Sequence, residues 1–290
     1  MQLDQAGAGT TGVLCSFGKQ MSFPMATSEF YDTLAPYYHL IYTDWEVSIG
    51  RQSRALDAII RSTGGPQPRS VLDTACGIGT QSIGLAQLGY EVTASDLSPS
   101  AVERAQREAS QRGLSIPCSV ADMRGVHAHH RRLFDVVIAC DNSIPHLLTD
   151  ADILTAFEDF HRCLAPGGLC LISVRDYATL DLSAQVQLHP YGVRQVGGTR
   201  YVLLQVWELR APLYDTTFYV IEHREGAEPV THASRATYYA VPITTLVRLM
   251  EQAGFSGVRR IDGEFFQPIL VGCKRPGPAQ GGAANERPHL

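Results

Sequence analysis

A glycine-rich turn is the part of the sequence that is best suited to hold a ligand. Gly77 and Gly79 lie in the segment DTACGIG, directly after a short apolar run. Two glycines let the backbone turn tightly and let a ligand approach it, and the helix that follows directs free N–H groups at the same place. Asp96 ends the next apolar run, where a carboxylate can accept both hydroxyls of a ribose. This spacing predicts a nucleoside-binding site.

Asp73, at the head of the same turn, indicates which nucleoside binds. A dinucleotide-binding G-x-G-x-x-G segment would have a third glycine where this chain has Ser82, and Asp73 would repel a pyrophosphate. S-adenosylmethionine instead carries an ammonium, a sulfonium and a ribose, and it has no phosphate. A turn used only for packing would explain neither Asp73 nor Asp96. The residues therefore favour S-adenosyl-L-methionine as the cofactor.

The overall composition disfavours several other classes of protein. The 290 residues include 24 Lys and Arg against 29 Asp and Glu, which gives a formal net charge of −5. This acidic balance disfavours a nucleic-acid partner, which would require a basic surface. No run of 18 apolar residues is present, so we expect no membrane-spanning helix. The seven cysteines are scattered and form no C-x-x-C pair, which disfavours structural zinc and favours the reducing cytoplasm.

A histidine-rich segment, HAHHRR at 127–132, has some features of a metal site. It contains no cysteine, and Asp135 is the one acid near it in the sequence. Cysteine or several acids would be expected beside the histidines of a metal centre. We therefore interpret the segment as a solvated polar loop and expect no metal.

The pattern of elements predicts a parallel sheet with helices on both faces. Short runs rich in Val, Ile, Leu and Cys alternate with helical patterns up to Arg175. The runs are apolar throughout, as strands covered on both faces require. Helices are expected over 46–61, from the glycine-rich turn to Leu88, over 98–113 with a Ser100–Glu103 capping box, and over 150–164.

The pattern of residue types along the sequence changes after Arg175. Residues 176–241 alternate between apolar and polar types and are rich in Tyr, Val and Thr, which predicts an antiparallel meander of three or four strands. A last helix over 242–253 and two further strands follow. We therefore expect the following division: a disordered leader at 1–27, a cofactor-binding α/β core at 28–175, a β insertion or lid at 176–241, the C-terminal part of the core at 242–274, and a disordered tail at 275–290.

These motifs together resemble the class I S-adenosylmethionine-dependent methyltransferases, over about residues 28–274. The segments at 73–79, 95–98 and 120–123 are similar to the first three motifs of that family, although Ala75 stands where many members have Gly. The resemblance implies a Rossmann-like sheet, mostly parallel with the last strand antiparallel. It also implies that Asp122 meets the adenine amino group and that Met123 packs on the ring. The residues expected to bind the cofactor are Asp73, Ala75, Cys76, Gly77, Gly79, Asp96, Leu97, Asp122, Met123, Asp141, Arg54 and Tyr31.

Within that family, the sequence is similar to the glycine and sarcosine N-methyltransferases. The segments D-x-A-C-G-x-G, N-S-x-x-H-L beginning at Asn142, and R-x-Y beginning at Arg175 all match that branch. The resemblance implies that Arg175 grips a substrate carboxylate and that Asn142 orients the amine. It also implies that a tyrosine of the N-terminal segment, such as Tyr42, lines the methyl-transfer site and that Arg51 or Arg54 meets the cofactor carboxylate.

Several of these residues have plainer interpretations. Arg175 could instead pair with Asp176 or Asp181, and Asn142 could serve only to turn the chain after the fourth strand. His146 could be a general base, but a packed histidine is the more common case. Tyr238 and Tyr239 could belong to the core of the insertion.

The leading hypothesis is therefore an enzyme that methylates the nitrogen of a small carboxylate-bearing amine. A second hypothesis is a small-molecule methyltransferase of secondary metabolism that acts on an amino sugar, a phenol or a quinone. A third is a cofactor-binding module without turnover. Nucleic-acid methylation is disfavoured because the segment after the fourth strand reads DNSIPHL and is not of the N-P-P-Y type, and because the net charge is acidic. The family is often oligomeric, so a homo-oligomer is a further expectation.

Overall fold

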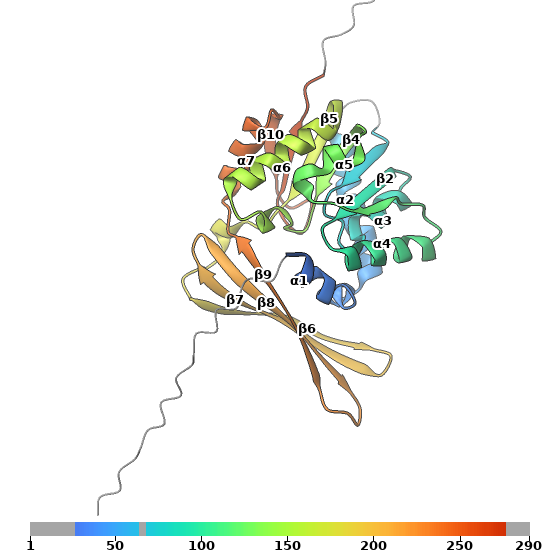
Figure 1. The fold of residues 1–290 in the computed structure, drawn as a ribbon, viewed down its shortest axis with the longest axis vertical. Helices are drawn as coiled ribbons and strands as arrows, with labels where there is room; N and C mark the ends of the chain where they lie inside the picture. Colours follow the sequence, from blue (N-terminus) through green and yellow to red (C-terminus); the bar gives the residue numbers. More distant parts are fainter. Residues whose placement is uncertain (1–26, 64–67, 277–290) are drawn as a thin grey trace, which may run out of the picture.

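The computed structural model describes residues 27–63 and 68–276 (Figure 1). The expected leader, apart from Thr27, and the expected tail, apart from residues 275 and 276, lie outside the described residues. The residues in these two ranges form two sheets. Within the described residues, no helix combines the length and the apolar character needed to span a bilayer.

The larger sheet has seven strands in the order β10-β11-β5-β4-β1-β2-β3. Strands β1 to β5 run parallel, whereas β11 runs antiparallel to both β5 and β10. This confirms the mostly parallel, Rossmann-like sheet with an antiparallel last strand. The strands are β1 Ser70–Asp73, β2 Glu91–Asp96, β3 Cys118–Val120, β4 Phe134–Ala139, β5 Leu164–Ser173, β10 Ser256–Ile261 and β11 Ile269–Cys273.

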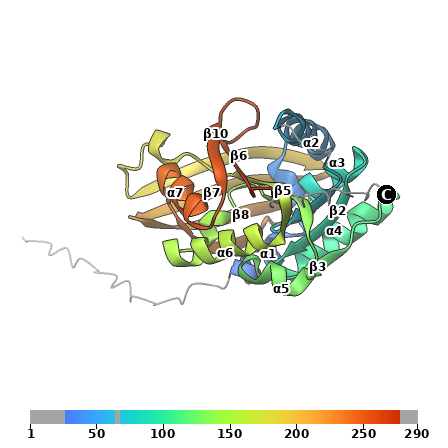
Figure 2. The ribbon, with the colours of Figure 1, turned by 90° about the horizontal axis from the view of Figure 1, so that it is seen from above.

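Helices cover both faces of this sheet because its strands are apolar on both faces (Figure 2). In β4, Val137 and Ala139 pack with α6 and α7, whereas Val136 and Ile138 pack with α2, α3 and α4. Successive strand residues point to opposite faces, so one strand serves both cores. The helices are α1 Thr27–Leu34, α2 Trp45–Ser62, α3 Thr80–Gln87, α4 Pro99–Gln111, α5 Val126–His130, α6 Asp150–Cys163 and α7 Ile243–Gln252.

The second sheet is the expected insertion, and it has four antiparallel strands in sequence order. Its strands are β6 Val186–Val196, β7 Thr199–Arg210, β8 Leu213–Arg224 and β9 Val230–Tyr239. Its inner face is aromatic, and Phe30 and Leu34 of α1 pack against it beside Trp207 and Tyr214. Helix α1, which the sequence analysis did not predict, therefore joins the insertion to the rest of the chain (Figure 1).

Two local predictions were wrong. The hydroxyl of Ser98, not that of Ser100, caps α4 by accepting the Ala101 N–H at 3.1 Å, because Pro99 already occupies the first helical position. The segment expected to be a polar loop at 127–132 instead forms most of the short helix α5. There His129 Nε2 lies 2.9 Å from the Ser119 hydroxyl.

The contact between α2 and α3 holds the helix that follows the glycine-rich turn, and it depends on Gly84. A Cβ at Gly84 would lie 2.6 Å from Ser53 Cβ and 2.8 Å from the Ile49 carbonyl oxygen. A backbone oxygen cannot rotate away, so the helices would have to separate. We expect Gly84→Ala to lower the free energy of unfolding by about 1–3 kcal/mol, measured by urea denaturation.

Gly125→Ala is the matched control, because no atom lies within 4 Å of its Cβ position and its φ is −136°. Equal stability of the two variants would contradict the close approach of α2 to α3.

Candidate functional site

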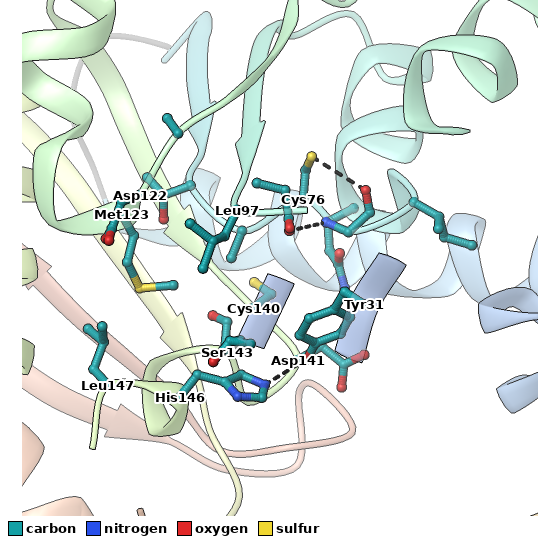
Figure 3. Close-up of a pocket in the computed structure, with 18 of the residues that line it drawn as sticks. Tyr31, Cys76, Leu97, Asp122, Met123, Cys140, Asp141, Ser143, His146 and Leu147 are labelled. Atoms are coloured by element: carbon teal, nitrogen blue, oxygen red, sulfur yellow. Dashed lines mark hydrogen bonds between the residues drawn. The ribbon is translucent and has the colours of Figure 1, made fainter. Parts of the chain in front are cut away.

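A cavity of about 300 Å³ lies at the carboxyl ends of β1, β2 and β4 (Figure 3). This is the edge at which ligands bind in open α/β sheets. Its wall combines the glycine-rich turn, the ends of these strands and the N-terminal tyrosines. Expected site residues on this wall are Tyr31, Tyr42, Ala75, Cys76, Gly77, Asp96, Leu97, Asp122, Met123 and Asp141.

The two glycines of the turn have different tasks. Gly77 has a φ of 51°, and its Cβ position is open for 4 Å in every direction, so the backbone here can be approached by a ligand. Gly79 has a φ of 94° and a Cβ position 3.1 Å from Ile83, and it precedes α3 without lining the cavity. Gly77 therefore leaves room for a ligand, whereas Gly79 allows the turn.

Asp96 is fixed at the cavity wall by the backbone. Its two carboxylate oxygens accept the N–H groups of Gly77 at 2.8 Å and of Ser98 at 2.9 Å. Burial raises the pKa of this carboxyl, and the backbone hydrogen bonds oppose that rise. Each oxygen keeps a free lone pair, so a fixed carboxylate is available to a pair of hydroxyls.

Asp73 does not reach the cavity, in contrast to the expectation that it would meet a cationic amino group. Its side chain is 1% exposed, and it accepts the Ser82 hydroxyl at 2.6 Å and the Ala75 N–H at 3.3 Å. Ser82, which stands where a dinucleotide-binding turn has glycine, is therefore the partner of Asp73. Burial raises the pKa of Asp73 to about 7.

Asp122 and Met123 lie side by side on another part of the wall (Figure 3). Arg124 binds Asp122 through both carboxylate oxygens and also reaches Asp152 at 2.8 Å. The hydrogen bond from Arg124 lowers the pKa of Asp122. This geometry keeps Asp122 ionised and leaves Met123 as an apolar surface that packs against the α6 side of the core.

The N-terminal tyrosines converge on one corner of the cavity. The hydroxyls of Tyr38 and Tyr42 donate to Asp141 Oδ2 at 3.2 and 3.3 Å. The Tyr31 hydroxyl lies 2.8 Å from His146 Nε2 (Figure 3). Arg54, in contrast, is an exposed residue of α2 and does not line the cavity, and Arg51 is also exposed.

His146 lies between this corner and the insertion. Its ring centroid is 4.1 Å from that of Tyr238, which is buried in the aromatic core of the insertion. Burial lowers the pKa of His146 to about 3, so the imidazole is neutral. Its contacts are those of a packed histidine that orients Tyr31.

A second, smaller cavity of about 50 Å³ adjoins the first. Tyr31, Tyr38 and Asp141 line both cavities, so the two share a wall. The remaining lining comes from α1, the ends of β4 and β5, and the inner face of the insertion. It includes Asn142, Arg175, Tyr191, Gln205, Trp207 and Tyr214.

Arg175 is the charged centre of the second cavity. Its guanidinium lies 4.7 Å from the Trp207 ring centroid and donates to the Tyr214 hydroxyl at 3.4 Å. The two acids considered as its ion-pair partners are engaged elsewhere: Asp176 pairs with Arg260 at 2.7 Å, and Asp181 accepts the Ser183 N–H. Within residues 27–63 and 68–276, Arg175 forms no salt bridge.

Asn142 fixes the backbone that carries Arg175. It has a φ of 63° and is 4% exposed. Its Oδ1 accepts the Arg175 N–H at 2.9 Å, and its Nδ2 donates to the Tyr177 hydroxyl at 2.9 Å. The side chain thus ties the end of β4 to the end of β5, and its carbonyl oxygen is already engaged.

Sequence reasoning placed Tyr38 in the candidate N-terminal segment without singling it out, and it missed Tyr191, Trp207 and Tyr214 as site residues. The last two lie on buried positions of alternating strands, in RYVLLQVWELR and LYDTTFYVIEHR. That alternation marks an inward face, but it does not show that Arg175 lies against it. In the part of the chain that the structure describes, no three His, Cys, Asp or Glu residues are grouped so that they could hold a metal ion.

Comparison with known proteins agrees with this geometry. Residues 71–168 match a family described as a methyltransferase domain. The glycine/sarcosine N-methyltransferase of Parasynechococcus marenigrum (strain WH8102) is 34% identical over 143 residues, which are 48% of this chain and 51% of that protein. The chain thus spans about half the length of this relative.

Solved structures share the fold. Streptomyces venezuelae DesVI has a TM-score of 0.72 at 18% identity and covers 84% of this chain and 98% of its own. The sugar N-methyltransferase KedS8 from Streptoalloteichus sp. ATCC 53650 has a TM-score of 0.69 at 19% identity and covers 94% of this chain and all of its own. Residues 71–168 are therefore a class I methyltransferase domain, a class whose cofactor is S-adenosylmethionine.

The buried Asp73 carboxyl predicts a characteristic pH dependence of stability. With a pKa of about 7 in the folded protein against 3.8 ordinarily, the folded state binds more protons between these values. The contribution of Asp73 to stability is therefore present below pH 3.8 and is lost as the pH rises through 7. In Asp73→Asn, Oδ1 can accept the Ala75 N–H and Nδ2 can donate to the Ser82 hydroxyl, so we expect this variant to gain stability relative to the wild type between pH 4.5 and 8.

Urea denaturation at four pH values across that range measures the difference. Asp262→Asn, an exposed side chain, is the control. Parallel stability profiles for Asp73→Asn and the wild type would contradict the raised pKa.

Proposed function

We propose that the protein transfers the methyl group of S-adenosylmethionine to the nitrogen of a small amine that carries a carboxylate. The observation that carries this proposal is Arg175, a half-buried guanidinium that faces a cavity beside the cofactor cavity and forms no salt bridge among the described residues. A planar guanidinium binds a carboxylate through two hydrogen bonds. The similarity to the Parasynechococcus protein, a glycine/sarcosine N-methyltransferase, supports the same substrate class.

The cofactor half of the site is proposed to follow the motif residues. Asp96 would accept the ribose hydroxyls, and Asp122 and Met123 would hold the adenine. Gly77, Ala75 and Cys76 would present backbone to the methionine portion. Residues 28–175 and 242–274 then form the cofactor-binding core, and residues 176–241 supply the acceptor wall.

Methyl transfer requires mainly that the amine and the methyl group are held in the right positions. The sulfonium is already activated, so holding the amine in line with the methyl group can supply about 7–11 kcal/mol of the barrier. Tyr31 and Tyr38 line both cavities, so they would flank a methyl group that moved from one cavity to the other. Aromatic rings there would stabilise a nearby cation by about 0.5–2 kcal/mol each.

A second candidate is a methyltransferase of secondary metabolism that acts on an amino sugar, a phenol or a quinone. The aromatic lining of the second cavity favours it, because Trp207 and Tyr214 offer stacking surfaces to a ring. The cavity itself favours the smaller substrate, since about 50 Å³ accommodates only a few non-hydrogen atoms.

The test is the release of S-adenosylhomocysteine with a panel of acceptors: glycine, sarcosine, dimethylglycine, other amino acids, an amino sugar and a catechol. We expect turnover with carboxylate-bearing amines. Arg175→Met should lower kcat/KM for these by at least about 100-fold, the equivalent of roughly 3 kcal/mol for a charged hydrogen-bonded pair. The Kd of S-adenosylhomocysteine should not change.

Arg107→Met is the matched control, because Arg107 is exposed on α4 and pairs only with Glu103 among the described residues. Preferred turnover of the amino sugar or the catechol, unaffected by Arg175→Met, would reject the carboxylate and support the second candidate.

A further inference from the structure

Asp141 occupies the boundary between the two cavities, and the proposed function gives it no task beyond the general expectation of cofactor binding. Its side chain lines both the first cavity, which is proposed to hold the cofactor, and the second cavity, which contains Arg175 and is called the Arg175 cavity below. Its φ of 57° is uncommon for a residue other than glycine, and the structure maintains it at this point. The Ser173 hydroxyl accepts the Asp141 N–H at 2.7 Å and holds the backbone in place.

One carboxylate oxygen of Asp141 is committed and the other is free. Oδ2 accepts the hydroxyls of Tyr38 and Tyr42, whereas Oδ1 accepts no hydrogen bond from any described residue. The carboxylate therefore has a fixed orientation and an unused acceptor, and it belongs to the wall that the two cavities share.

We propose that Asp141 binds the substrate ammonium and takes its proton before methyl transfer. This proposal rests on the proposed function and extends it, since Arg175 and Asp141 together would recognise a zwitterion: a carboxylate at one end and an ammonium at the other. An amine attacks only through a free lone pair, which an ammonium lacks. A base at the boundary of the cavities supplies the neutral amine where the methyl group is received.

The step balances in atoms and charge. The ammonium gives one proton to the Asp141 carboxylate. The nitrogen lone pair then forms a bond with the methyl carbon while the carbon–sulfur bond breaks, and its electron pair remains on sulfur as S-adenosylhomocysteine. The product leaves as a methylated ammonium, and the proton on Asp141 passes to solvent.

The neighbours of Asp141 leave it as the group that titrates in this corner. Burial raises its pKa, while the tyrosine hydrogen bonds and Arg175 oppose that rise. Four tyrosines and Cys140 face Asp141, and burial raises the pKa of each, so they stay protonated near neutral pH. The titratable and charged groups that face Asp141 are Tyr31 on α1, Tyr38 and Tyr42 in the segment after α1, Cys140 after β4, Arg175 after β5, and Tyr191 on β6.

The first experiment is the pH profile of Asp141→Asn, a variant that still accepts from Tyr38 and Tyr42. With glycine or sarcosine, we expect kcat/KM at pH 7 to fall by about 10²–10⁴-fold. The wild-type profile should level off between the pKa of Asp141 and that of the substrate amine. The variant, which uses only the neutral amine already in solution, should gain tenfold per pH unit up to the amine pKa. Asp181→Asn, which removes an exposed acid outside both cavities, should keep the wild-type profile.

The second experiment separates Asp141 from Arg175 without turnover. Saturation-transfer NMR measures the binding of glycine and of acetate to protein loaded with S-adenosylhomocysteine. Asp141→Asn should weaken glycine and leave acetate unchanged, whereas Arg175→Met should weaken both. A loss of S-adenosylhomocysteine affinity in Asp141→Asn, with the wild-type pH profile retained, would assign Asp141 to the cofactor and overturn the proposal.

Failure of the proposed function gives a different result. If the wild type methylates only an amine without a carboxylate, the same pH profiles are recorded with that amine. Dependence on Asp141 without dependence on Arg175 would then support the base and reject the zwitterion. A wild-type profile in Asp141→Asn with that amine would reject the base as well.

Discussion

A half-buried cation without a salt bridge in the described part of the chain is the constraint around which the acceptor side of this protein is arranged. Moving a guanidinium out of water costs several kcal/mol, and the ring of Trp207 returns only about 2 kcal/mol of that. The long hydrogen bond to Tyr214 adds little. The surrounding contacts hold Arg175 in position: Asn142 fixes its backbone, and Tyr177 and Tyr214 hydrogen-bond to each other at 3.0 Å beside it. The Asp141 carboxylate, which lines the same cavity, offsets part of this cost without a salt bridge, and the proposed substrate carboxylate would offset more of it.

The cofactor side of the site was largely predictable because its parts are close in the sequence. A glycine-rich turn, an acid at the end of the next strand and a further acid after the third strand all fall between residues 73 and 123. Parallel strands bring their carboxyl ends to one edge, so the topology alone places these residues together. Asp73 is the instructive exception. Its charge was interpreted as a ligand contact, but the Ser82 hydroxyl binds it inside the turn.

The acceptor side could not be predicted in the same way, because it is assembled by long-range contacts. Tyr31 meets His146 across 115 positions of the chain, and Tyr38 meets Asp141 across 103. Alternation in the insertion identified strands, but not that Trp207 would lie under Arg175. Helix α1 has eight residues, and it is stabilised by packing against two other parts of the molecule.

Helix α1 also gives a physical reason why the two halves of the site act together. Asp32 accepts the Ser98 hydroxyl at 2.5 Å, and the Ser98 N–H in turn donates to Asp96 in the cofactor cavity. Two residues earlier, Phe30 packs against the inner face of the insertion, within the same core cluster as Tyr238. A displacement of the insertion therefore moves α1, and α1 is bonded to the residue that holds Asp96. Tyr31 lies on this helix and lines both cavities, so its position at their shared wall would depend on both sheets at once.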